Sequence, residues 1–309
     1  MKNQSSKRML LGQPGNTLVL LLAILVVVFC LFTFLHLAYS LTNEDTAAAN
    51  NSYYQGILAW FRMPASLKLL SSRPWTIFTY MFIHDGVWNL IGNLIWLWVF
   101  GFILQDLTGN KTILPLFIYS ALSGAVLYLI CMNVFPGLRN FVSTELIEGA
   151  SAGVMGIAIA TTILAPGYRF FPMINGGIPL WVITAIYVVI DLAMIANLNA
   201  AGSHIAHLGG GLFGWLFMSQ LQKGKDLSLG MNRFFDWING IFAPEESEAR
   251  DKTRTAVFYE KGEKEPYKKI PQLTQKRIDA ILDKIGEKGY DKLTEEEKEL
   301  LRKAAEDKN

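Results

Sequence analysis

Long stretches of this chain carry almost no charged residues, and short polar segments separate them. Asp, Glu, Lys and Arg are absent from residues 86–105, 112–138 and 149–168, and Asp191 is the only one between residues 170 and 222. A membrane-spanning helix needs about 20 predominantly apolar residues. The pattern therefore predicts an all-α polytopic membrane protein with six spanning helices, at Thr17–Ala38, Trp88–Gln105, Thr112–Phe135, Ala150–Ala165, Pro179–Ala196 and His204–Leu221.

The composition agrees with a membrane protein. Of the 309 residues, 51% are hydrophobic and 17% are charged, whereas soluble domains average about 25% charged residues. The net charge of +2 says little, because it averages an almost uncharged body with a densely charged tail. Cys30 and Cys131 both lie in apolar runs, so we expect buried thiols there rather than a disulfide.

Basic residues near the helix ends favour a cytoplasmic N-terminus and a cytoplasmic C-terminus. The first apolar run is too long for a signal peptide and no convincing cleavage site follows it, so we expect it to stay as a span. The short inner segments hold Lys2, Lys7, Arg8, Lys111, Arg169, Lys223 and Lys225, while the short outer loops hold only Arg139. In this orientation Ser151 and His207 lie at similar depth, each near the outer end of its helix.

Four segments are expected along the chain. They are a cytoplasmic N-terminus at 1–16, a six-helix membrane core at 17–222, a linker with a candidate interfacial helix at 223–270, and a helical hairpin at 271–309. Residues 53–63 in the first outer loop are aromatic and apolar but too short to span. This stretch either lies in the membrane interface or packs on the bundle, and the sequence favours neither.

The charged tail contains helix signals but no catalytic signature. Ile278, Ile281, Leu282 and Ile285 form the stripe of one buried helix face, and Thr294 to Glu297 has the form of a capping box for a second helix. The tail holds neither histidine nor cysteine. We expect it to bind an unidentified cytoplasmic partner, if any, rather than to take part in catalysis.

Ser151 and His207 are the residues that most directly suggest chemistry. Ser151 lies in Gly-Ala-Ser-Ala-Gly at the start of one predicted span, and His207 lies in Ala-His-Leu-Gly-Gly-Gly inside another. A hydroxyl becomes a good nucleophile when a base takes its proton, and polar groups inside a membrane by default indicate function. The pair therefore predicts a serine nucleophile and its histidine base.

Glycines favour His207 over His204 as the base. Gly210, Gly211 and Gly214 follow on the face of His207 and would let a neighbouring helix approach closely. If that neighbour is the Ser151 helix, the two side chains come within hydrogen-bond reach. The alternative is that the glycines only tighten a helix pair of no chemical consequence.

Two asparagines supply candidate donors for an oxyanion. Asn89 and Asn93 stand one turn apart on one face of the second span, so both amides can point to one place. The N-terminus of the Ser151 helix offers further N–H groups. Interhelical hydrogen bonds without catalytic meaning explain the asparagines equally well.

At this point the chain resembles the rhomboid intramembrane serine proteases. The motifs are Gly149-Ala150-Ser151-Ala152, Ala206-His207-Leu208-Gly209-Gly210, and His84 through Asn93 followed by Trp98-Val99-Phe100-Gly101. The resemblance covers about residues 70–220, and three motifs in the right order make it specific. The tail is similar to C-terminal extensions of some bacterial rhomboids, which favours a bacterial inner membrane.

The resemblance implies a six-helix rhomboid bundle with a Ser–His dyad that cleaves transmembrane protein substrates. By motif position Ser151 is the nucleophile, His207 the general base and Asn93 an oxyanion donor, with Asn89 beside it. Two positions depart from the family: Ala152 stands where glycine is common, and Asn89 stands where many members have histidine. The partners expected are the lipid bilayer and membrane proteins, with no nucleic acid, no cofactor and no metal.

Alternatives remain open. A rhomboid-like protein of weak or no activity that binds and escorts membrane helices would explain the two departures, but it has no evident need for the serine and histidine. A channel or transporter would need polar residues through the full membrane depth, whereas the polar positions here cluster at the outer ends of the predicted helices. Asp191 could complete a Ser–His–Asp triad, although a polar anchor near the interface is favoured and Asp191 is left outside the catalytic set.

Overall fold

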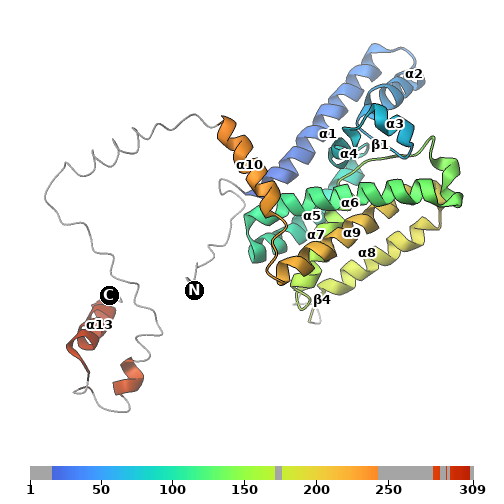
Figure 1. Cartoon of the computed structure of the whole chain (residues 1–309). Helices are drawn as coiled ribbons and strands as arrows, with labels where there is room; N and C mark the ends of the chain where they lie inside the picture. The colour runs from blue at the N-terminus through green and yellow to red at the C-terminus, as the bar shows by residue number, and fades with distance from the viewer. Residues whose placement is uncertain (1–15, 171–175, 243–280, 286–289, 291–292, 307–309) are drawn as a thin grey trace, which may run out of the picture. The chain divides into compact units, whose positions relative to one another are not determined.

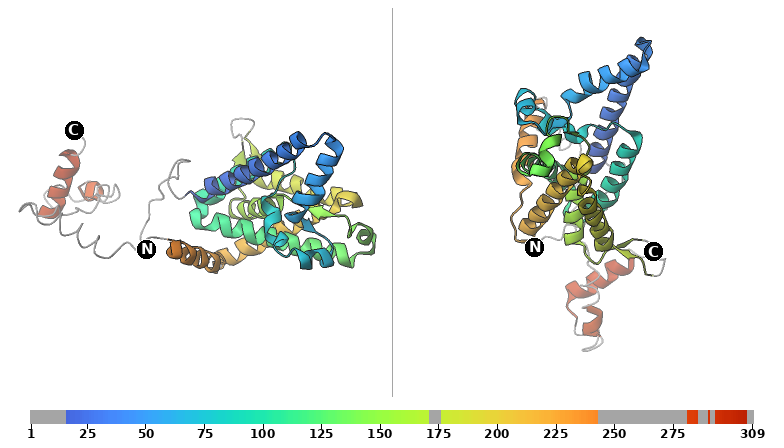
Figure 2. Two further views of the ribbon diagram at one scale, coloured as in Figure 1. Left: turned by 90° about the horizontal axis from the view of Figure 1, so that it is seen from above. Right: turned by 90° about the vertical axis from the view of Figure 1, so that its right-hand side faces the viewer.

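The computed structural model describes residues 16–170, 176–242, 281–285, 290 and 293–306. The chain divides into two compact units, residues 1–242 and 243–309. The first unit is a bundle of helices, seen from three directions in Figures 1 and 2. The predicted segment boundaries within the chain stay predictions.

Helices make up most of the first unit. The α-helices are α1 (Thr17–Thr42), α2 (Thr46–Asn51), α3 (Leu67–Ser72), α4 (Thr76–Thr79), α5 (Val87–Thr108), α6 (Ile113–Val134), α7 (Ser151–Leu164), α8 (Leu180–Ile195), α9 (Ala201–Gln222) and α10 (Leu229–Phe242). Short 3-10 turns lie at Leu58–Trp60, Tyr80–Phe82, Asn110–Thr112, Pro136–Phe141 and Leu198–Ala200, and a π-helical turn lies at Ser52–Ile57. Two antiparallel pairs complete the unit, β1 (Met63–Pro64) with β2 (Leu146–Ile147) and β3 (Arg169–Phe170) with β4 (Ile178–Pro179).

The six long helices α1, α5, α6, α7, α8 and α9 occur where the sequence predicts them, with their ends shifted by a few residues. In the described residues, however, three segments are long and apolar enough to cross a membrane: Thr17–Thr42, Val87–Thr108 and Asn110–Val134. The α7 helix has 14 residues, which is about 21 Å at 1.5 Å per residue, short of a hydrocarbon core of about 30 Å. The expectation of six spans is thus met in part, by three clear ones.

The α7 and α9 helices form the centre of the bundle. The α7 helix contacts α5, α6, α8 and α9, and α9 contacts α6 and α8 as well. A methyl group added at Gly210 would overlap the backbone of Ala152, and one at Gly214 would overlap the backbone of Gly156. These contacts confirm that the glycine face of α9 packs tightly on the helix that begins at Ser151.

Apolar side chains cover the outside of the bundle. Large hydrophobic residues that are exposed include Val27, Leu31 and Phe34 on α1, Trp88 and Ile95 on α5, and Val189, Ile190 and Leu192 on α8. Water-soluble proteins rarely expose contiguous apolar patches of this kind. The surface suits contact with lipid chains.

The aromatic stretch in the first loop packs on α1. Tyr53 and Leu58 are buried with Phe32 of α1, and the Tyr53 hydroxyl donates to the Phe32 carbonyl oxygen at 3.0 Å. The His36 ring stacks on Tyr53 with ring centroids 4.2 Å apart. Of the two alternatives for this loop, the structure shows the packed one.

The second unit contains α13 (Glu295–Glu306) and a helical turn at residues 281–285. The predicted capping box is confirmed, because Thr294 N–H donates to Glu297 Oε2 at 2.8 Å and Glu297 N–H donates to Thr294 Oγ1 at 3.3 Å. Lys284 donates to both Glu297 carboxylate oxygens at 2.8 Å. Ile278, in the predicted stripe, lies outside the described residues.

Candidate active site

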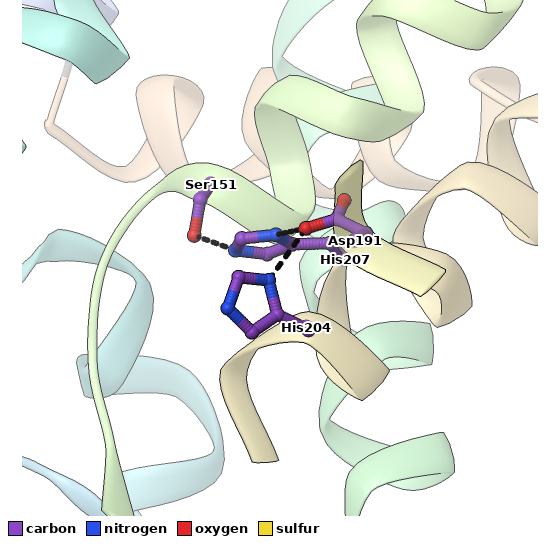
Figure 3. Close-up of polar contacts among 4 residues, drawn as sticks. All are labelled: Ser151, Asp191, His204 and His207. Atoms are coloured by element: carbon purple, nitrogen blue, oxygen red, sulfur yellow. Dashed lines mark hydrogen bonds and ion pairs between the residues drawn. The ribbon is translucent and has the colours of Figure 1, made fainter. Parts of the chain in front are cut away.

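Ser151 and His207 meet where α7 packs on α9. The Ser151 Oγ lies 2.6 Å from His207 Nε2, and Figure 3 shows the two side chains pointing toward each other. Ser151 is the first residue of α7, and His207 lies in the second turn of α9. This separation is suited to proton transfer from a hydroxyl to an imidazole.

A sharp backbone turn places Ser151 at the start of α7. Gly149 has a φ of +116°, a conformation that residues with a Cβ rarely adopt. Its N–H donates to the Tyr80 carbonyl oxygen at 3.0 Å, and the next N–H, of Ala150, points to His84 Nε2 at 3.4 Å. The glycine therefore turns the chain into α7 with Ser151 directed at the site.

The segment before this turn is fastened to the first loop. Strands β1 and β2 pair there, and Arg62 beside β1 forms an ion pair with Glu148 beside β2. Burial lowers the pKa of the Arg62 guanidinium, and the carboxylates of Asp85 and Glu145 oppose that shift. The first loop thus supports the serine turn through a backbone pair and a largely buried ion pair.

His207 is held on its other side by Asp191 of α8. The Asp191 Oδ1 lies 2.9 Å from His207 Nδ1 and 2.7 Å from His204 Nδ1 (Figure 3). Asp191 is 1% exposed. His204 contacts this carboxylate, while His207 contacts both the carboxylate and Ser151, so the structure places His207 beside the serine as the glycine pattern predicts.

The same three side chains are of the kinds that bind metal ions. Asp191, His204 and His207 form such a group among the described residues. Tetrahedral zinc would separate its ligand atoms by roughly 3.3 Å, whereas the nitrogen-to-oxygen distances of 2.7 and 2.9 Å are those of N–H···O hydrogen bonds. The geometry is that of a hydrogen-bonded cluster.

Amide groups of α5 surround the space beside the serine. A methyl group placed on Gly149 would lie 3.5 Å from Ser151 Oγ, 3.9 Å from Asn93 Nδ2 and 4.0 Å from Asn89 Nδ2. The Asn93 Nδ2 donates to Asn89 Oδ1 at 3.0 Å and lies 3.2 Å from His84 Nε2. Negative charge that develops in this space would meet amide donors, so the two predicted asparagines do lie near Ser151.

Ala152 fits its position because another helix lacks a side chain. Ala152 is buried, and a methyl group added at Gly124 of α6 would lie 2.9 Å from the Ala152 Cβ. The extra methyl of Ala152 therefore occupies space that glycine at position 124 leaves open. The departure at position 152 is accommodated by packing.

A pocket of about 290 Å³ opens onto these residues. Its lining combines polar side chains with aromatic ones, which include Trp88, Trp96 and Tyr187. The Tyr187 ring stands edge-on to His207, with ring centroids 6.1 Å apart. Both Ser151 and His207 line this pocket, so a ligand bound in it would contact the two side chains.

The sequence found part of this site. It paired Ser151 with His207 and placed Asn89 and Asn93 near them, but it gave no role to His84 and set Asp191 aside as an anchor. A signal for Asp191 was present, because it is the only charged residue between positions 170 and 222. The signal for His84 was weaker, namely its position five and nine residues before Asn89 and Asn93.

Two parts of the chain match known protein families. Residues 71–223 match the rhomboid domain, and residues 266–306 match a family of unknown function, DUF6576. The chain is similar to Rhomboid protein 1, mitochondrial, of Saccharomyces cerevisiae, with 27% identity over 156 residues, which are 48% of this chain and 43% of that protein. It is also similar to RHOMBOID-like protein 12, mitochondrial, of Arabidopsis thaliana, with 27% identity over 163 residues, 50% of this chain and 48% of that protein. The match therefore spans less than half the length of either relative.

Proposed function

We propose that this rhomboid-family protein is an intramembrane serine endopeptidase, with Ser151 as nucleophile and His207 as general base. The observation that carries the proposal is the 2.6 Å contact between Ser151 Oγ and His207 Nε2. Two helices bring these atoms together beside a pocket with amide donors. The rhomboid domain supports membrane proteins as substrates, and the substrate segments proposed are transmembrane ones.

The reaction follows from the positions of the two side chains. As Ser151 Oγ bonds to the substrate carbonyl carbon, its proton passes to His207 Nε2 and an electron pair moves onto the carbonyl oxygen. His207 then gives that proton to the leaving amine nitrogen as the C–N bond breaks. Water attacks the acyl-enzyme with His207 again taking the proton, which returns to Ser151 Oγ when the acyl bond breaks.

The carbonyl oxygen gains negative charge during both attacks. The first N–H groups of α7 have no partner four residues earlier in the helix, so they are available as donors. Asn93 and Asn89 add side-chain amides around the space beside Gly149. Such donors stabilise the transition state more than the ground state, which is what accelerates the reaction.

The protein is an integral membrane protein, and its orientation is part of the proposal. We propose that all six long helices lie in the membrane with both termini cytoplasmic, which places the Ser151 end of α7 toward the opposite surface. The tail similarity favours a bacterial inner membrane. The two relatives carry mitochondrial names and do not support that compartment, so fractionation of the source cell has to decide it.

The decisive experiment is labelling of the purified protein with a fluorophosphonate probe, together with cleavage of a reporter transmembrane substrate in liposomes. Wild type is expected to label and to cleave, and Ser151→Ala to do neither. Ser71→Ala is the matched control, because Ser71 is an exposed serine on α3, outside the pocket.

The opposite results would identify the other function. Cleavage by Ser151→Ala at the wild-type rate would contradict the proposal. Binding of membrane helices by wild type without labelling or cleavage would assign the chain as a protein that escorts such helices.

A further inference from the structure

The buried face of α8 contains an unexpected carboxylate. Of the 16 residues in α8, those that are buried are Leu180, Thr184 and Asp191. Thr184 has a structural explanation, because its hydroxyl lies 2.6 Å from that of Thr162 on α7. Asp191 needs another, since a carboxylate away from water is costly unless its partners satisfy it.

Among the described residues, two histidines of α9 contact the Asp191 carboxylate. Its Oδ1 lies 2.7 Å from His204 Nδ1 and 2.9 Å from His207 Nδ1. A carboxylate accepts hydrogen bonds and does not donate them, so each imidazole must carry its proton on Nδ1. Neutral His207 then has its lone pair on Nε2, the atom that lies 2.6 Å from Ser151 Oγ.

We propose that Asp191 is a positioning residue for His207, so that the dyad works as a Ser151–His207–Asp191 triad. The inference rests on the proposed function and deepens it. Asp191 fixes the imidazole in the tautomer and orientation that the base needs, and its negative charge stabilises the imidazolium that forms when Nε2 takes the serine proton. In this role Asp191 accepts the hydrogen bond from His207 Nδ1–H, and the serine proton is not passed on to it.

A simple anchor between α8 and α9 does not require this arrangement. The hydrogen bond to His204 alone would join the two helices, and His204 does not contact Ser151. The second hydrogen bond, to His207 Nδ1, reaches the side of the ring opposite the serine contact (Figure 3). Asp191 therefore contacts the imidazole ring of the proposed base directly.

The test compares Asp191→Asn with Thr184→Val in the full-length protein reconstituted in liposomes. Asparagine keeps the size of Asp191 but removes its charge. The Thr184 change removes a buried hydrogen bond between α8 and α7 without touching Ser151 or His207, so it is the matched control for helix packing. Ser151→Ala gives the baseline for the proposed function.

We expect Asp191→Asn to lower kcat by up to about 10⁴-fold, the loss that the same change causes in a serine–histidine–aspartate triad, with KM within about twofold of wild type. Fluorophosphonate labelling of Ser151 should slow in parallel. Thr184→Val should keep kcat within about threefold of wild type, because it leaves the base and its tautomer unchanged.

Four results of the activity measurements would overturn the inference. If Asp191→Asn keeps wild-type kcat while Ser151→Ala is inactive, Asp191 is only an anchor and the protease assignment stands. If Ser151→Ala still cleaves, the proposed function fails and the triad fails with it. Equal losses in Asp191→Asn and Thr184→Val would assign the effect to packing, and loss of wild-type activity with EDTA that zinc restores would make the cluster a metal site.

A measurement on the unaltered protein covers the case in which Asp191→Asn does not fold. In micelles, the ¹⁵N spectrum of labelled histidine, with His207 assigned by comparison with His207→Ala, reports which ring nitrogen carries the proton. The triad requires the proton on Nδ1. A proton on Nε2 of neutral His207 would overturn it.

Discussion

Substitution of Gly210 by alanine tests whether the close approach of α9 to α7 sets the geometry of the site. A Cβ at position 210 would overlap the carbonyl group of Ala152, which is backbone and cannot rotate away. Gly211 is the matched control, because a Cβ there would meet side-chain atoms and no backbone, Met155 Cγ at 3.2 Å and Ile159 Cγ1 at 3.3 Å. Both glycines are buried in the same helix.

The comparison of the two variants isolates the overlap. Replacing glycine by alanine inside a helix favours the helix by about 1 kcal/mol, and this gain is common to both positions. Overpacking a tight interface costs about 1–3 kcal/mol, and we assign this cost to Gly210→Ala alone. The free energy of unfolding of Gly210→Ala should therefore be about 1–3 kcal/mol below that of Gly211→Ala.

Activity should separate the two variants more strongly than stability does. Gly210 lies one turn after His207, so a shift of α9 away from α7 lengthens the 2.6 Å contact with Ser151. A displacement of about 1 Å in catalytic groups costs about 100-fold in rate. Denaturant unfolding in micelles followed by tryptophan fluorescence, and initial cleavage rates in liposomes, measure the two effects. Equal stability and equal rates for both variants would refute the reasoning.

Other predictions concern the oxyanion donors and the tail. Asn93→Ala should lower kcat by about 100-fold, the scale for one such donor, while Asn89→Ala should lower it less; wild-type rates in the double variant would give α5 a structural part only. Truncation near Glu245 should keep insertion and cleavage, since no catalytic candidate lies beyond it, and loss of cleavage in an inserted, stable truncated protein would contradict this. The hydrogen bonds from Lys284 lower the pKa of Glu297 below its value in the unfolded chain. Their contribution to the stability of the second unit is therefore present at neutral pH and is lost as pH falls through the folded-state pKa. Hydrogen-exchange protection of α13 should fall on acidification, and a Glu297→Gln variant should show the lower protection already at pH 7.

The sequence predicted the helices well because their signal is local. Apolar runs bounded by charged or polar segments fix where α1, α5 and α6 lie to within a few residues. Whether a helix crosses a membrane depends also on its length in the folded protein. The predicted spans at residues 150–165 and 179–196 become helices of 14 and 16 residues, fewer than the about 20 that a span needs, so these two are not among the three clear spans.

The site was only partly predictable because its contacts join helices that are far apart in the chain. The serine and histidine motifs carry local glycine patterns, so their partnership was within reach. The contact of Asp191 with His207 depends on how α8 is rotated against α9, and the contact of His84 with Ala150 depends on a turn at Gly149. No local sequence pattern predicts the rotation of α8 or the turn on which the contact of His84 depends. In the sequence Asp191 is therefore an isolated charge, and its partners are identified only in the structure.

The effect of Ala152 on the site also depends on packing between helices, which a local sequence pattern does not show. Read along the chain, an alanine in place of the usual glycine is one change in the serine motif, and it supports a protein that binds helices without cleaving them. In the bundle the methyl group of Ala152 lies against Gly124 on α6, and the missing side chain of Gly124 leaves the space that this methyl group fills. A substitution next to a nucleophile disturbs the site only if the surrounding helices cannot absorb it, and here one residue on a neighbouring helix does. The alanine therefore gives no support to inactivity, and Asn89 remains the departure that bears on the rate.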